Sequence, residues 1–130
     1  MKLLLDIGAS RTRMAVSEGE KLGEIVSFET PQNPDEGLRV IADGAQKILN
    51  GVRPVAVAAG VAGVFDKERT MLMGAPNLPA WIGQPLKEAF ERAFSAPVLL
   101  ENDAALGGLG EARYGVGRGH DIVAYLAIGT

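Results

Sequence analysis

Residues 3–12 read LLLDIGASRT, an apolar run that holds one carboxylate and closes in a turn of small residues. A continuous apolar run of this length is typical of a strand buried on both faces. Polar and apolar residues then alternate over residues 11–17, and a further apolar-rich stretch covers residues 24–30. The spacing predicts three antiparallel strands at the start of the fold.

Helices and strands alternate along the rest of the chain. Asn33 and Pro34 form a typical helix start, and apolar residues at helical spacing follow as far as Leu49. The later expected elements are a strand at 52–59, a loop with Gly60 and Gly63, a short strand at 70–73, a helix from Pro85, a strand at 97–100, a helix at 102–114 and a strand at 121–128. This order predicts an α/β fold, a mixed sheet with an antiparallel three-strand start and helices on both faces.

Composition limits the classes of partner. The chain has 130 residues, 47% hydrophobic and 22% charged, which predicts a single globular domain. A net charge of −3 lacks the basic excess that nucleic acid binding requires, so we expect no nucleic acid partner. The absence of cysteine excludes disulfides and thiolate metal sites. The longest apolar run, residues 122–128, is too short for a membrane span, and we expect a cytoplasmic protein with no membrane partner.

The turn after the first apolar run is suited to hold a phosphate. Gly8 allows close approach of the backbone, and the amides and the Ser10 hydroxyl can donate hydrogen bonds. Asp6, at the end of the strand, can hold a hydrated Mg²⁺. An ordinary hairpin turn is the alternative interpretation.

A second candidate site lies where a strand is followed by a helix, at residues 101–105 (ENDAA). Asn102 is a good helix cap and Asp103 lies in the first turn, so capping is one complete explanation. The functional alternative is that Asp103 accepts a proton from a substrate hydroxyl while that oxygen attacks phosphorus.

The helix that begins there contains Gly107, Gly108 and Gly110. Each glycine costs about 1 kcal/mol relative to alanine in a helix interior. We therefore expect another element to approach this helix closely, the alternative being an irregular, weak helix.

Five segments in order resemble the amino-terminal domain of the ROK family of repressors, open-reading-frame proteins and sugar kinases, in the actin-like ATPase, ribonuclease H-like superfamily. They are residues 6–12 (DIGASRT), 59–64 (AGVAGV), 76–81 (PNLPAW), 101–104 (ENDA) and 110–119 (GEARYGVGRG). The resemblance covers nearly the whole chain. It implies ATP-dependent phosphorylation of a hexose or N-acetylhexosamine, with Mg²⁺ and commonly as a homodimer.

Site roles follow from the resemblance by position. Asp103 would be the general base, Asn102 and Asn77 would bind sugar hydroxyls, and Gly60, Ala62 and Gly63 would line the sugar pocket. ATP phosphates would meet Asp6, Gly8, Ala9, Ser10, Arg11 and Thr12, and Gly129 and Thr130 would begin the second phosphate motif. Ala9 and Ser10 stand where the family usually has glycine and threonine. A structural zinc is expected only in the family's carboxy-terminal domain.

The resemblance also sets the expected limits of residues 1–130. They would form the amino-terminal domain alone, because the family's remaining sugar ligands and adenine pocket lie in a second domain. Positioning supplies most phosphoryl-transfer catalysis, so we expect little turnover from half a cleft. The alternatives are the sugar-sensing domain of a ROK repressor, which would need a DNA-binding domain before Met1, and an actin-like assembly protein.

Overall fold

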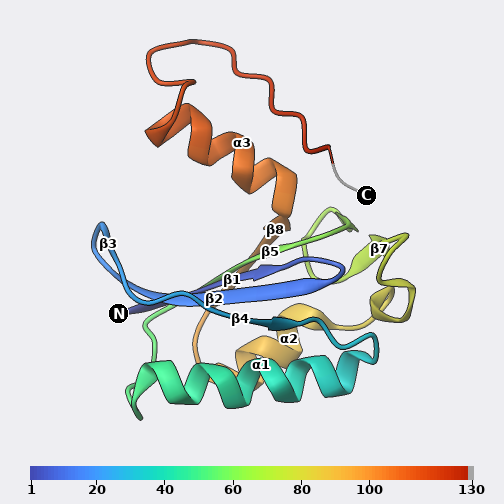
Figure 1. Ribbon diagram of the computed structural model, residues 1–130. Helices are drawn as coiled ribbons and strands as arrows, with labels where there is room; N and C mark the ends of the chain where they lie inside the picture. The colour runs from blue at the N-terminus through green and yellow to red at the C-terminus, as the bar shows by residue number, and fades with distance from the viewer. Residues whose placement is uncertain (129–130) are drawn as a thin grey trace.

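The computed structural model describes residues 1–128 (Figure 1). A mixed sheet with strand order β3-β2-β1-β5-β8 forms its centre, and β4 also pairs with β2. A small β6-β7 hairpin lies beside this sheet. The elements are β1 Lys2–Ile7, β2 Arg11–Glu18, β3 Lys21–Leu22, β4 Val26–Glu29, α1 Pro34–Leu49, β5 Val57–Val61, β6 Val64–Phe65, β7 Leu72–Gly74, the 3-10 helix η1 Pro79–Trp81, α2 Leu86–Phe94, β8 Val98–Asn102 and α3 Asp103–Tyr114.

The sheet is antiparallel at one side and parallel at the other, as the sequence predicts. β1 pairs antiparallel with β2 and parallel with β5, and β5 pairs parallel with β8. In this register Asp6 lies opposite Gly60, and Gly60 lies opposite Glu101. The carboxyl ends of β1, β5 and β8 therefore meet at one edge of the sheet.

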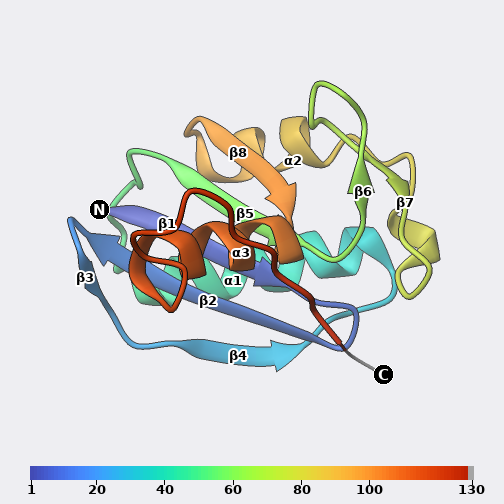
Figure 2. The same cartoon turned by 90° about the horizontal axis from the view of Figure 1, so that it is seen from above.

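Helices cover both faces, which confirms the layered prediction. Figure 1 shows α1 and α2 below the sheet and α3 above it, and Figure 2 shows α3 over β1 and β5. The Asn33 side chain accepts the Glu36 N–H at 3.0 Å and so caps α1, with Pro34 in its first turn. Asn50, at φ 49°, ends the same helix in the left-handed conformation that favours termination.

The main core fills the space between the sheet and the helices α1 and α2. Leu3, Leu5 and Ile7 of β1 are buried there with the aromatic residues Trp81 and Phe90. The Trp81 indole donates from Nε1 to the Pro31 carbonyl at 3.2 Å, so its polar group is satisfied although the residue is fully buried. Among residues 1–128, no helix combines the length and apolar character that crossing a bilayer requires.

Two strand predictions differ in their bounds. The expected strand at 52–59 is β5, which begins only at Val57 and continues to Val61, so Gly60 lies in the strand and not in a loop. Pro54, which has no N–H to donate, lies in the stretch that stays out of the ladder. The expected strand at 24–30 is β4, which covers only Val26–Glu29, and the short strand β3 before it was not predicted. Gly23, between the two, donates its N–H to the Val16 carbonyl.

The predicted strand at 121–128 is wrong, because none of these residues forms a strand. A strand needs a neighbouring backbone to complete its hydrogen bonds. The segment instead passes α3 (Figure 1) without pairing with a strand, and Ile122, Leu126 and Ile128 are exposed. An apolar run is therefore not sufficient to predict a strand here.

Gly37→Ala should destabilise the fold, because a Cβ there would lie 2.8 Å from Cη2 of Trp81. A bulky, fully buried ring cannot move away easily, so we expect a loss of about 1–3 kcal/mol in the free energy of unfolding, measured by urea denaturation. Gly44→Ala in the same helix is the control, since its Cβ would meet the flexible end of Met14 at 3.1 Å and the Phe28 ring at an ordinary contact distance of 3.8 Å. Equal losses for the two variants would contradict this account of the core.

Candidate functional site

A cavity of about 430 Å³ lies between the carboxyl ends of β1 and β5 and the first turns of α3. Asp6 and Asp103, which are far apart in the sequence, both line it. Gly60 is the neighbour of Asp6 in the sheet and lies beneath the start of α3. It also lines the cavity, and it contributes no side chain to it. The edge where parallel strands end is where open α/β sheets bind ligands.

Gly60 allows α3 to sit on the sheet. A Cβ at this position would lie 3.1 Å from Cδ1 of Leu106 and 3.5 Å from the Asp103 Cα atom. An added methyl group would require the Leu106 side chain to shift by a few tenths of an ångström. Gly60 thus packs closely beneath the start of α3, and its place in a sugar pocket stays a prediction.

The first turn of α3 is tied down by side-chain hydrogen bonds. Asn102 Oδ1 accepts the Ala105 N–H at 3.0 Å, and its Nδ2 donates to the Gly63 carbonyl at 2.7 Å. Asp103 Oδ1 accepts the Ala104 N–H at 2.8 Å. Asn102 is therefore the helix cap that the sequence predicts and also a link to the turn after β5.

Asp6 lies on the face of the sheet that carries α3, and its side chain is half-exposed. Its Oδ2 lies 3.3 Å from the Arg13 guanidinium of the neighbouring strand. An exposed ion pair of this kind is worth at most about 1 kcal/mol. Asp6 therefore remains available to a ligand that brings its own positive charge.

The turn after β1 is supported from behind by the residues that follow β4. Thr30 Oγ1 donates to the Gly8 carbonyl at 2.8 Å, the Thr30 N–H donates to Ser10, and Gln32 Nε2 donates to Ala9 at 3.2 Å. The carbonyls of Gly8, Ala9 and Ser10 thus all accept hydrogen bonds from Thr30 and Gln32. Among residues 1–128, the N–H groups of Ala9 and Ser10 have no hydrogen-bond acceptor, so they remain free for an anion.

One predicted contribution to this turn, that of Thr12, is corrected. Thr12 is fully buried and its hydroxyl lies 2.8 Å from that of Thr30, so it supports the turn and does not face a ligand. Gly8 is needed for the turn itself, because a Cβ there would lie 2.9 Å from the Arg11 carbonyl. Arg11 is exposed, with its guanidinium 3.5 Å from the Ser27 hydroxyl.

A second cavity, of about 380 Å³, lies on the other side of Asn102, between the β6-β7 hairpin and the end of β8. Asp66 shapes its wall by accepting the Thr70 hydroxyl at 2.6 Å and the N–H groups of Thr70 and Met71. These hydrogen bonds, with that from the Thr70 hydroxyl first, lower the pKa of Asp66 below its usual 3.8. The ionised Asp66 carboxylate therefore holds the two ends of the loop after β6 together.

The structure places the remaining predicted residues as follows. Gly63 lines the second cavity, and a Cβ there would lie 3.1 Å from Ala75, so the loop that carries the exposed Asn77 begins against this turn. Ala62 continues the sheet, donating its N–H to the Ile7 carbonyl at 2.9 Å. Gly129 and Thr130 lie outside the described residues.

The glycines of α3 have the close neighbour that the sequence predicts. A Cβ at Gly107 would lie 2.8 Å from the Tyr125 ring, and one at Gly108 would lie 3.1 Å from its Cβ atom. Tyr125 also lines the cavity that holds Asp6 and Asp103. Gly110 has open space around it and is not explained by this contact.

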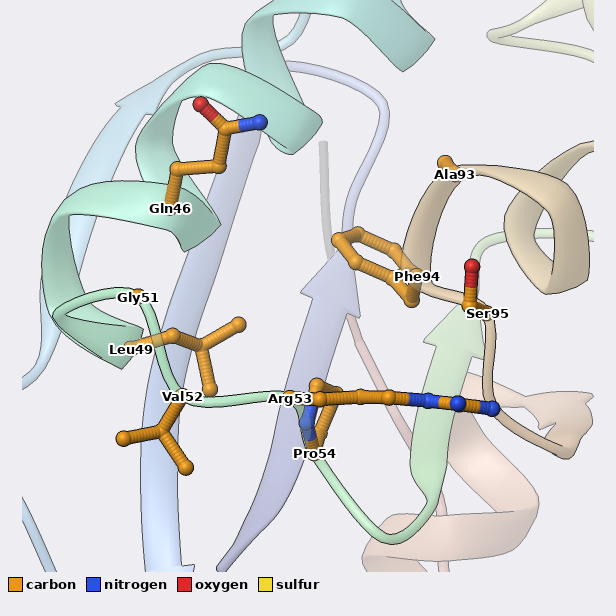
Figure 3. Close-up of a pocket in the computed structure, with 9 residues that line it drawn as sticks. All are labelled: Gln46, Leu49, Gly51, Val52, Arg53, Pro54, Ala93, Phe94 and Ser95. Carbon is orange, nitrogen blue, oxygen red and sulfur yellow. The ribbon is translucent and has the colours of Figure 1, made fainter.

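A larger cavity, of about 530 Å³, lies elsewhere, where α1 and α2 end (Figure 3). Leu49, Pro54 and Phe94 contribute apolar surface, and the Arg53 side chain crosses it toward Ser95. The stretch 51–54 precedes β5, so this cavity is at the amino end of the parallel strands. It has no carboxylate and is not the candidate site.

Within residues 1–128, no three acidic or histidine residues are grouped to hold a metal ion. Mg²⁺ often takes only one or two protein carboxylates and otherwise binds water and substrate phosphate. Asp6, half-exposed in the cavity, fits that limited role.

The ROK family model matches residues 3–130. The chain belongs to the ROK family. It is 33% identical to the glucokinase of Streptomyces coelicolor over 133 residues, covering 100% of this chain and 42% of the relative. A xylose repressor of Caldicellulosiruptor bescii is 28% identical, over 96% of this chain and 33% of the repressor.

Solved structures agree on the fold. A ROK family glucokinase from Streptomyces griseus, in complex with glucose and AMPPNP, superposes with a TM-score of 0.84 at 31% identity, over 92% of this chain and 38% of that one. The ROK domain has the actin-like ATPase fold that the sequence predicts. The chain spans about two fifths of the length of the relatives that it matches.

The residues that hold the site from outside were not predicted from the sequence. Thr30 and Gln32 follow β4, and Arg69 donates to Glu101 beside Asn102. One signal was present, since polar residues follow the stretch at 26–29, in which apolar and polar residues alternate. The partners were not predictable, because each contact joins segments that are distant in the sequence.

Thr30→Val should destabilise the fold more than Thr12→Val. Thr30 has one hydroxyl hydrogen, which goes to the Gly8 carbonyl, so Thr12 must be the donor between the two hydroxyls. Removing Thr30 Oγ1 leaves the partly buried Gly8 carbonyl and the buried Thr12 hydroxyl without these partners, a loss of about 1–3 kcal/mol in unfolding free energy by urea titration. Thr12→Ser, which keeps the donor, should lose less than Thr12→Val. A larger loss for Thr12→Val than for Thr30→Val would contradict this network.

Asp66→Asn should lower the urea midpoint at neutral pH. The folded-state pKa of Asp66 lies below 3.8, so its ionised form stabilises the fold above that pH, and this contribution is lost as the pH falls through the folded-state pKa. The midpoints of wild type and variant should therefore converge in acid. The exposed Asp43→Asn variant serves as control, and a wild-type advantage that persists unchanged to the lowest pH would refute the assignment.

Proposed function

We propose that residues 1–130 form the amino-terminal lobe of an ATP-dependent kinase that phosphorylates a hydroxyl of glucose or a related hexose. The observation that carries the proposal is the shared cavity of Asp6 and Asp103. The turn with the free amides follows Asp6 closely in the chain, and Asp103 lies in the first turn of the capped helix α3. The glucose and AMPPNP bound by the Streptomyces griseus relative support this choice of substrates.

In the proposed mechanism Asp103 is the general base. The Ala104 N–H engages Oδ1, which leaves Oδ2 to accept the proton of a sugar hydroxyl. The deprotonating oxygen attacks the terminal phosphorus of ATP, the bond from that phosphorus to the bridging oxygen breaks, and ADP leaves. The proton then passes from Asp103 to solvent, and a sugar phosphate is the second product.

The turn at 8–11 binds the phosphates in this proposal. The N–H groups of Ala9 and Ser10 donate to phosphate oxygens, and the exposed Arg11 adds positive charge nearby. Mg²⁺, held through Asp6, would neutralise charge that develops on the phosphates. Among the sugar ligands, the second amide hydrogen of Asn102 is not used by Gly63 and is available to a hydroxyl.

Residues 1–130 supply only one side of the proposed cleft. The relatives are more than twice as long, and we propose that their additional length corresponds to a second lobe that supplies the rest of the cleft. Asn77 and Gly63 would lie on the sugar side, while Gly129 and Thr130 would lead into the second phosphate motif. The family's homodimers make a dimer our proposal for the assembled protein.

A sugar-sensing repressor is the second candidate, since xylose repressors are among the relatives. Such a protein would bind sugar without consuming ATP. Steady-state ADP release in the presence of glucose distinguishes the two, and sugar binding without ADP release would favour the sensor.

Asp103→Asn should lower kcat by about 10²- to 10⁴-fold, because the amide cannot accept the proton. The measurement is a coupled ADP-release assay on the longest gene product that contains residues 1–130, with the unfolding midpoint recorded in parallel. Asp43→Asn, on the outer side of α1, is the matched control for charge loss. If Asp103→Asn lowers only the unfolding midpoint and leaves kcat intact, capping is its role and the general-base proposal fails.

A further inference from the structure

Arg69, in the loop between β6 and β7, has a backbone conformation that glycine adopts more easily. Its φ is 54°, in the left-handed region that is unfavourable for a residue with a side chain. The other non-glycine residues with positive φ among residues 1–128 are Asn50 and Ser95, and both directly follow helices, where this conformation is common. Arg69 does not follow a helix, so helix termination does not account for its conformation. The contacts of its side chain are the alternative explanation.

The side chain reaches the end of β8. Arg69 Nε donates to Glu101 Oε2 at 2.7 Å, and Glu101 Oε1 accepts the backbone N–H of Asn102 at 2.9 Å. One carboxylate therefore joins the guanidinium to the residue that caps α3. Glu101 is mostly buried, with 27% of its side chain exposed, which makes this pair less screened than the exposed ion pairs elsewhere.

The loop does not need this contact to keep its shape. Asp66 closes it through the Thr70 hydroxyl and the N–H groups of Thr70 and Met71, and the Arg69 N–H donates to the Asp66 carbonyl at 3.1 Å. All of these bonds would survive truncation of the Arg69 side chain. The Arg69 guanidinium is therefore not needed for the shape of the loop, although the backbone that carries it is strained.

We propose that Arg69 is a positioning residue that acts through Glu101 to hold Asn102, and with it Asp103, at the sugar side of the site. Asn102 is then held on two sides, by Glu101 at its backbone N–H and by the Gly63 carbonyl at its side chain. Asp103 follows directly in the chain, so a rotation of Asn102 reorients the carboxylate. The consequence for catalysis rests on the proposed function, but the hold on Asn102 does not.

The first test measures amide hydrogen exchange at Asn102 in this chain. Arg69→Gly removes the guanidinium and relieves the left-handed strain, so it should leave the unfolding midpoint unchanged or raised while exchange at Asn102 becomes about three- to tenfold faster. Arg69→Lys, which keeps a donor, should restore part of the protection. Lys67→Ala, which removes an exposed cation from the same loop, is the control and should leave exchange unchanged.

Two results would overturn the positioning role. One is unchanged exchange at Asn102 in Arg69→Gly. The other is faster exchange at Asn102 that accompanies an equal loss of protection over the whole sheet, because that would mark a general structural role.

The second test uses the kinetics of the longest gene product that contains residues 1–130. Arg69→Gly should lower kcat/KM for the hexose about three- to tenfold and leave KM for ATP unchanged, since the Arg69 side chain bonds to Glu101 beside Asn102 and not to the turn at 8–11. An active wild type with no change in Arg69→Gly overturns the catalytic consequence. A wild type that phosphorylates no hexose defeats the proposed function instead, and the exchange at Asn102 then still decides the positioning role.

Discussion

The parallel pairing of β5 with β1 on one side and β8 on the other is the constraint on which the site depends. Its register aligns Asp6, Gly60 and Glu101 in one row across the sheet. A shift of one residue in either pairing would move these side chains to the opposite face, toward the apolar core. The absence of a side chain at Gly60 then lets α3 begin directly above the row, which brings Asp103 to the cavity of Asp6.

The polar groups of the site are held by residues that do not line it. Thr12 and Thr30 are the buried polar residues of the described chain, and their hydroxyls support the turn at 8–11 from the core side. Buried hydroxyls are unfavourable unless each finds a partner, so this pair stabilises one conformation of the turn over others. At the other end of the site, Asn102 plays the same part for α3 through its bonds to Gly63 and Ala105.

Local signals predicted most elements correctly. The alternation over 11–17 and the Asn33–Pro34 helix start depend only on neighbouring residues, and both predictions are confirmed. The segment at 121–128 shows where such signals fail. It is as apolar as a buried strand, but strand formation requires a partner backbone, and among the described residues this segment has none. Gly60 was assigned to a loop for a similar reason, since glycine is common in turns and its place in β5 depends on packing against α3.

The sequence by itself determined the class of fold, the two polar motifs at strand ends and the family, because hydrophobic spacing, turn residues and motif order are local properties of the chain. Only the tertiary structure decided that Asp6 and Asp103 share one cavity, that Thr12 faces the core, and that Arg69 reaches Glu101. Each of these depends on strand register or on a contact between distant segments. Such contacts form only when the sheet and helices pack together, so no window of neighbouring residues contains them.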